Sequence, residues 1–199
     1  MSAITKDTIE QAYSFGAYFR LVEKAVAAGE STGENDSEDL AAYTKLNLQR
    51  MTRLLKTITI NSELSAKLKT IQEPVIWLVL TEGWCGDAAQ NIPVLYKMAQ
   101  QNSNIQLRLI LRDENLEIMD QFLTDGGRSI PKLIALHPET LTVHYTWGPR
   151  PQPAQKMMIA FKEGTGEQDY ETFAKNLQSW YNHDKTQTLQ KEIARIIHA

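Results

Sequence analysis

Residues 74–88 of this chain read PVIWLVLTEGWCGDA, which joins an apolar run to a short polar loop and the start of a helix. The run Val75–Thr81 is continuous, apolar and rich in strand-favouring residues, which is typical of a strand covered on both faces. From Ala88 onward, apolar residues recur at helical spacing. The stretch therefore predicts a buried strand that passes through the loop 82–87 directly into a helix.

Three more strand-like segments follow this first unit. Residues 105–111 alternate apolar and polar side chains and predict a second strand, and Lys132–His137 with Leu141–Trp147 predict a hairpin. Because a helix connects the first two strands, we expect them to be parallel, with the hairpin adding antiparallel strands. The sequence therefore predicts an α/β fold with a four-stranded mixed sheet flanked by helices.

The sequence before the first strand has a helical pattern throughout. Residues 7–28 predict one helix, with Asp7 and Glu10 placed as a capping box, and further helical stripes follow over residues 40–58 and 62–71.

The sequence pattern changes from helical to strand-like at Pro74, which suggests that the chain has two parts. We expect a helical N-terminal extension over residues 1–70 that packs on the sheet, and a domain over residues 71–199 that ends in helices.

Composition excludes several classes of protein. The 199 residues are 42% hydrophobic and 23% charged with a net charge of −3, which is typical of a globular domain and disfavours a nucleic-acid surface. The longest apolar run, Val75–Leu80, is far shorter than the roughly 20 residues that cross a bilayer, so we expect no membrane segment. Residues 1–15 lack the apolar stretch of a secretion signal, which predicts a cytoplasmic protein. The single cysteine and the spacing of the four histidines predict neither an intramolecular disulfide nor a metal site.

Several landmarks together resemble the thioredoxin-like superfamily. Trp84-Cys85-Gly86 stands at the first strand-to-helix junction, and Pro93 lies where thioredoxins carry a kinking proline. Pro131 opens a strand where the family places its cis-proline, and Gly148 falls where a glycine closes the substrate groove. The resemblance covers roughly residues 70–162 and is closest to a bacterial subgroup with a helical N-terminal extension.

This resemblance implies a site around Cys85. A helix N-terminus stabilises a thiolate, so we expect an accessible thiol with a pKa below about 8.5, although a free cysteine is more commonly a small buried hydrophobe. The Ile130–Pro131 bond is expected to be cis. The substrate groove implied by the family is formed by Trp84, Gly86, Asp87, Ala88, Ile130, Pro131, Trp147, Gly148 and Arg150.

Some of these groove residues also have simpler interpretations. Asp87 suits the first turn of a helix, and the tryptophans suit core packing as well as a groove wall. Arg150 is expected to favour the thiolate of Cys85 or to bind a ligand carboxylate through two hydrogen bonds. Its substitution is expected to leave the fold intact. The alternative for Arg150 is a surface ion pair.

Two departures from the family pattern limit the implied chemistry. Ala88 stands where thioredoxins have their second cysteine, and Val79 stands where they bury an aspartate. Both argue against a general disulfide reductase.

Two functions therefore remain open. The first is a monothiol oxidoreductase in which Cys85 attacks a disulfide or mixed disulfide and is released by an external thiol, with no cofactor. The second is a redox-inactive module that binds a peptide or partner in the same groove.

Overall fold

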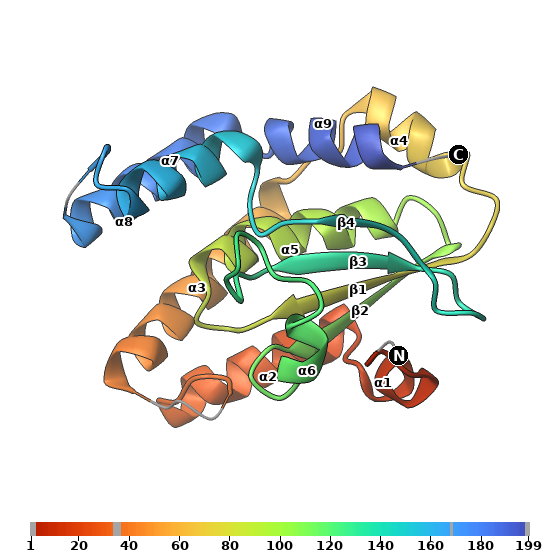
Figure 1. Cartoon of the computed structure of the whole chain (residues 1–199), viewed down its shortest axis with the longest axis horizontal. Helices are drawn as coiled ribbons and strands as arrows, with labels where there is room; N and C mark the ends of the chain where they lie inside the picture. The colour runs from red at the N-terminus through yellow and green to blue at the C-terminus, as the bar shows by residue number, and fades with distance from the viewer. Residues whose placement is uncertain (1–2, 34–36, 168, 198–199) are drawn as a thin grey trace.

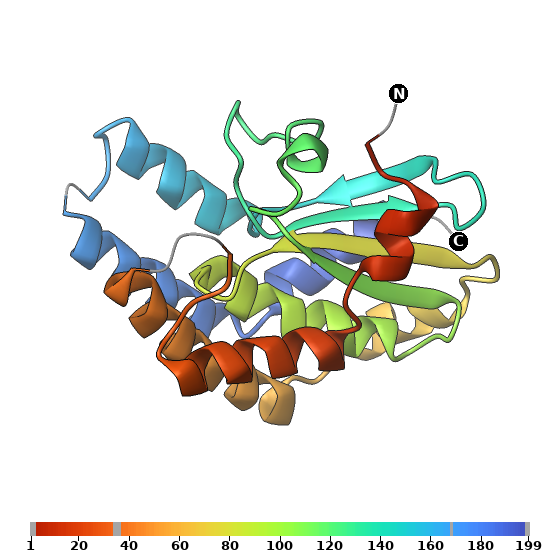
Figure 2. The ribbon, with the colours of Figure 1, turned by 90° about the horizontal axis from the view of Figure 1, so that it is seen from below.

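The structure is a computed structural model that describes residues 3–33, 37–167 and 169–197. Residues 1–2, 34–36, 168 and 198–199 belong to the predicted ranges 1–70 and 71–199 but lie outside the described residues. The described residues form a central sheet with helices on both faces (Figures 1 and 2). None of the helices described is both long and apolar enough to span a bilayer. The elements are α1 (Lys6–Gln11), α2 (Phe15–Ala28), α3 (Glu38–Thr57), α4 (Ser62–Lys69), β1 (Val75–Thr81), α5 (Gly86–Ala99), β2 (Ile105–Leu111), α6 (Leu116–Met119), β3 (Lys132–Leu136), β4 (Val143–Trp147), α7 (Gln152–Lys162), α8 (Tyr170–Asp184) and α9 (Gln187–Ile196).

The sheet is mixed, with the strand order β2-β1-β3-β4. β1 and β2 are parallel, and their pairing runs from Val75 opposite Ile105 to Thr81 opposite Leu111. β3 is antiparallel to β1, and β4 is antiparallel to β3. Every residue of β1 is buried, as a central strand with helices on both faces requires. The predicted α/β fold is confirmed, and the ranges predicted for β1 and β2 agree with the structure.

The prediction of one helix over residues 7–28 is wrong, because the chain leaves the helical conformation between α1 and α2. The backbone of Tyr13 pairs there with Leu109 at the outer edge of β2, with N–O distances of 2.8 and 2.9 Å. The side chain of Ser14 then caps α2. These hydrogen bonds satisfy an otherwise open strand edge, and helical periodicity does not reveal them.

The predicted capping box at Asp7 and Glu10 is also wrong. Thr5 is the N-cap of α1 and exchanges hydrogen bonds with Thr8, three residues later. The helix therefore begins earlier than its acidic residues suggest.

One hydrophobic core joins the N-terminal helices, the sheet and α9. Tyr18 and Val22 of α2, Leu68 of α4 and Ile193 of α9 are buried in the same cluster as β1. Phe15 also stacks on Tyr96 of α5, with ring centroids 4.0 Å apart. Side chains before residue 70 therefore contribute to the core that holds the sheet.

The α7–α8 hairpin has a small apolar cluster of its own. Ala154, Phe173, Leu177 and Tyr181 are buried in that cluster and are not part of the main core. Both views show the hairpin extending beyond the end of the sheet at which β1 ends (Figures 1 and 2). The hairpin is thus attached to the sheet, but it is not built into the sheet's core.

Replacing Leu68 with Ala should destabilise the whole protein, because this side chain is fully buried in the shared core. We expect a loss of about 2–5 kcal/mol in the free energy of unfolding, measured by urea titration of the full chain. The control Leu46→Ala removes a leucine that is 41% exposed and should change the value by no more than about 0.5 kcal/mol. An early helical transition that leaves the sheet folded would contradict a shared core.

Candidate functional site

The loop after β1 places Cys85 as the N-cap residue of α5. Its Sγ accepts a hydrogen bond from the backbone N–H of Ala88 at 3.4 Å. The thiol in turn donates to the carbonyl oxygen of Ile130 at 3.3 Å. Cys85 therefore links the start of α5 to the residue before Pro131, which places it next to the predicted groove.

The expectation of an accessible thiol with a lowered pKa is wrong for this conformation. Cys85 is only 8% exposed. Burial raises its pKa to about 12, and the nearby carboxylate of Asp87 adds to the rise. The N–H of Ala88 and the charge of Arg150 act in the opposite direction but do not outweigh burial. The helix N-terminus is present as predicted, yet the thiol stays protonated near neutral pH.

Asp87 lies at the centre of a buried polar network. Arg150 donates to its Oδ2 from Nε at 2.9 Å and from Nη2 at 2.5 Å. The hydroxyl of Tyr181 in α8 donates to Oδ1 at 2.7 Å. The side chains of the ion pair are only 8% and 9% exposed. Both carboxylate oxygens of Asp87 are therefore satisfied inside the protein.

The surface ion pair considered for Arg150 is therefore wrong, because its partner is buried. Its remaining contact also stays within the protein, since Nη1 donates to Gln155 at 2.8 Å. The charge of Arg150 favours the thiolate of Cys85, as expected, although its hydrogen bonds go to Asp87 and Gln155.

Pro131 and Gly148 are in direct contact. The Ile130–Pro131 and Gly148–Pro149 peptide bonds are cis. Gly148 has φ of +116°, and a Cβ on this residue would lie 2.2 Å from the carbonyl oxygen of Pro131. Only glycine fits such a position without moving the backbone. The end of β4 therefore returns beside Pro131, as its distance along the sequence predicts.

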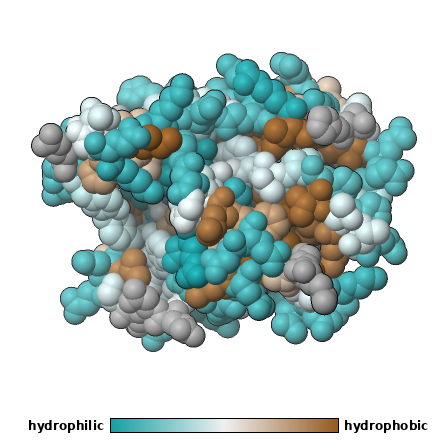
Figure 3. Space-filling model, in the orientation of Figure 1, coloured by the Kyte–Doolittle hydropathy of each residue, from teal (hydrophilic) through white to brown (hydrophobic). Residues whose placement is uncertain are grey.

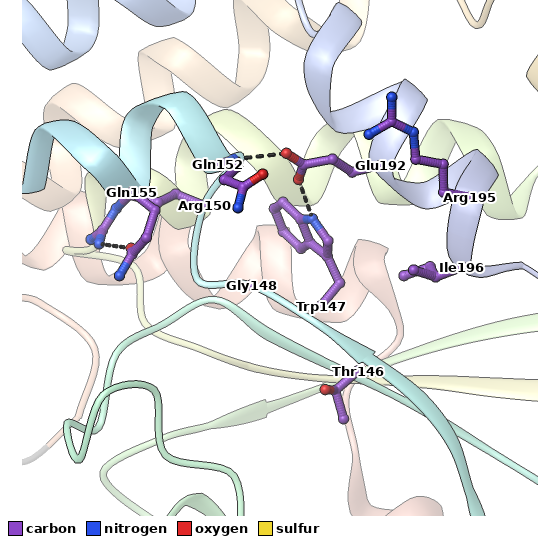
Figure 4. Close-up of a pocket in the computed structure, with 9 residues that line it drawn as sticks. All are labelled: Thr146, Trp147, Gly148, Arg150, Gln152, Gln155, Glu192, Arg195 and Ile196. Atoms are coloured by element: carbon purple, nitrogen blue, oxygen red, sulfur yellow. Dashed lines mark hydrogen bonds between the residues drawn. The ribbon is translucent and has the colours of Figure 1, made fainter. Parts of the chain in front are cut away.

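The two predicted groove tryptophans lie in different surroundings. Trp84 is half-buried, and the guanidinium carbon of Arg112 lies 4.7 Å from its ring centroid. Trp147 is buried and donates from its indole N–H to Glu192 of α9 at 2.8 Å. Trp147 also lines a pocket of about 350 Å³ with Gly148 (Figure 4).

The predicted site residues are thus only partly gathered around the thiol. Gly86, Asp87 and Ala88 follow Cys85 in the first turn of α5, and Ile130 and Arg150 reach this turn from the other side. Trp147 instead faces the pocket between the end of β4 and α9, in which Arg150 and Gln155 point toward each other (Figure 4).

Sequence reasoning missed Glu82, which is completely buried at the end of β1. Its Oε2 accepts from the Thr32 hydroxyl at 2.5 Å, and its Oε1 accepts from the Asp113 backbone N–H at 3.0 Å. Burial raises the pKa of this carboxyl group, although both hydrogen bonds oppose the rise. A glutamate directly after a fully apolar strand was the available signal.

It also missed the residues of α3 and α8 that surround the cysteine loop. Asn47 donates to the carbonyl oxygen of Gly83 at 2.9 Å and accepts from Arg50 at 2.9 Å. Tyr181 reaches Asp87 from a position 94 residues later in the chain. No local pattern in the sequence marks these residues.

In the part of the chain that the structure covers, no group of three or more His, Cys, Asp or Glu side chains is arranged to hold a metal ion.

The mixed sheet, the cysteine at the start of the helix after β1 and the contact between Pro131 and Gly148 define a thioredoxin-like protein. Residues 33–163, more than half of the chain, match the family described as Thioredoxin. The chain therefore belongs to this family.

Two solved structures share its fold. One is a protein of unknown function from Pseudomonas aeruginosa, with 19% identity, a TM-score of 0.57, and coverage of 92% of this chain and 96% of that chain. The other is an HIV epitope scaffold with 19% identity, a TM-score of 0.55, and coverage of 92% and 97%. At this level of identity the similarity shows the fold alone. No protein of curated function matches the sequence.

Arg150→Ala should destabilise the protein, contrary to the expectation from sequence, because it leaves the Asp87 carboxylate buried without its counter-charge. We expect a loss of about 3–5 kcal/mol in unfolding free energy. Combining it with Asp87→Asn should recover part of that loss in a double-mutant cycle. Arg128→Ala, which breaks an exposed ion pair with Asp120, is the control and should cost far less. Equal losses for the two arginine variants would contradict the assigned role.

Alkylation of Cys85 by iodoacetamide should show a raised pKa. The rate in the folded protein should keep increasing above pH 9 toward the pKa of about 12, because only the thiolate reacts. The same chain unfolded in urea is the control, and its rate should level off above the ordinary value of about 8.5. Mass spectrometry of timed samples measures both profiles. A folded-state midpoint at or below the unfolded one would show that the thiol is not held in its protonated form.

Proposed function

We propose that this protein carries out monothiol thiol–disulfide exchange through Cys85. The observation that supports this most is the place of the thiol, at the N-terminus of α5 and hydrogen-bonded to the carbonyl oxygen of Ile130, beside Pro131. Ala88 offers no second sulfur, so an external thiol must resolve any mixed disulfide. We place the reaction in the cytoplasm, where reducing thiols are available.

The exchange needs one disulfide and one external thiol. Cys85 first loses its proton to solvent, and its thiolate attacks one sulfur of the substrate disulfide. A bond forms between that sulfur and Cys85 while the substrate S–S bond breaks, and the second sulfur leaves as a thiolate that takes up a proton. The external thiol, as its thiolate, then attacks the substrate sulfur and displaces Cys85. The net result is a new disulfide between substrate and external thiol.

A second function is supported by the same site. The burial of Cys85 and its raised pKa favour a redox-inactive module that binds a peptide or partner protein. In that case the thiol acts only as the N-cap of α5.

Incubating the full chain with a small aromatic disulfide tests the first function. We expect a mixed disulfide on Cys85, seen as a mass increase, that an added monothiol releases. Cys85→Ser is the control and should form none. Ala88→Cys should release the aromatic thiol without an external thiol, because the new sulfur is placed to resolve the mixed disulfide. A wild-type protein that forms no mixed disulfide between pH 7 and 10 would support the binding module instead.

A further inference from the structure

The α7–α8 hairpin crosses the end of the sheet at which Cys85 lies. α7 leaves beside β4, and α8 returns beside α3 and α5 (Figure 2). In the space-filling view, a notch separates this hairpin from the start of α3 (Figure 3). Gln178 Nε2 lies 3.4 Å from where a Cβ on Gly86 would be, and the Tyr181 hydroxyl bonds Asp87. Helix α8 therefore covers the two residues that follow Cys85.

The contacts that hold α8 in this place are polar. Side chains of α8 make hydrogen bonds to α5 and α3, and apolar packing is concentrated inside the hairpin itself. The hydrogen bonds are Tyr181 to Asp87 at 2.7 Å, Gln90 to Gln178 at 2.8 Å, Arg53 to Asn182 at 3.0 Å and Asn91 to Tyr181 at 3.1 Å.

Packing and backbone conformation mark the boundaries of the α7–α8 hairpin. Its apolar cluster is separate from the main core, whereas α9 on its far side is anchored in that core through Leu189 and Ile193. Between α8 and α9, Lys185 and Thr186 both have left-handed backbone conformations, with φ of 49° and 67°. Moving the hairpin therefore breaks a few hydrogen bonds but leaves the main core packed.

We propose that α7 and α8 form a cap over the first turn of α5, where Cys85 is the N-cap residue, and that the cap opens as a unit to let a reactant reach the sulfur. Such a cap would limit the access of reagents to Cys85, which is only 8% exposed. It goes beyond the proposed exchange reaction, because the opening controls access for any reagent. Tyr181 acts as the latch, since it donates to Asp87 and accepts from Asn91.

The experiment combines hydrogen exchange with alkylation of the full chain. In the wild type, amides of α8 should exchange faster than those of β1 in the main core, because the cap opens without global unfolding. Tyr181→Phe keeps the ring in the hairpin cluster but removes the latch. We expect about tenfold faster iodoacetamide alkylation of Cys85, because a hydrogen bond to a charged group is lost. Exchange in α8 should accelerate, and exchange in β1 should not.

Two further variants complete the test. Ser179→Ala removes an exposed hydroxyl of the same helix whose hydrogen bond goes to His183 of that helix, so both rates should stay at the wild-type level. Asn182→Asp adds a charge opposite Arg53 and should slow alkylation about twofold by strengthening the closed state.

The cap is overturned if α8 and β1 exchange at the same rate, or if Tyr181→Phe accelerates all elements equally, because the hairpin then opens only with the whole fold. An unchanged alkylation rate in Tyr181→Phe overturns it as well. Measuring each rate across pH separates opening, which changes the rate at every pH, from a change in the Cys85 pKa, which moves the midpoint. A variant that alkylates quickly but forms no mixed disulfide would count against the exchange function and leave the cap intact.

Discussion

The buried carboxylate of Asp87 is the constraint on which the site depends. An isolated carboxylate inside a protein is costly, by several kcal/mol even after relaxation, so a chain that buries one must bring partners to it. Here the partners come from distant segments, with Arg150 arriving from the turn after β4 and Tyr181 from α8. The contacts of this one side chain therefore tie the turn after β4 and helix α8 to the cysteine loop. An electrostatic requirement at the loop is thus met by segments that are distant in the sequence.

The same ion pair also acts on the thiol, whose pKa is raised mainly by burial. Burial of the sulfur disfavours a thiolate on Cys85, and the negative charge of Asp87 adds to this effect. Arg150 offsets part of this effect, but its guanidinium is already shared with the carboxylate. The helix N-terminus, which favours a thiolate in an open site, is thus outweighed by burial. Burial and the carboxylate of Asp87 together therefore keep the Cys85 thiol protonated near neutral pH.

Much of the fold could be predicted because its signals are local. The ranges 75–81 and 105–111 follow directly from apolar runs and alternation, and the return of Gly148 to Pro131 follows from the length of a hairpin. The features that escaped prediction all depend on contacts between distant residues. The break at Tyr13 is set by hydrogen bonds to a strand edge about a hundred residues later, and Asp87 finds its partners Arg150 and Tyr181 63 and 94 residues later. A pattern read within one segment contains no information about such partners.

The N-terminal helices belong to the site as much as to the core. Gly83, two residues before the cysteine, donates its N–H to Thr32 at 2.7 Å, and its carbonyl oxygen accepts from Asn47 at 2.9 Å. A Cβ on Gly83 would lie 3.0 Å from the Thr32 side chain, so the absence of a side chain lets the two segments meet. Thr32 also donates to Glu82, which links the same loop to a buried carboxyl group. The segment before residue 70 therefore fixes the cysteine loop from one side while α8 covers it from the other. The geometry of this loop is a product of both ends of the chain, and the thioredoxin-like core alone does not determine it.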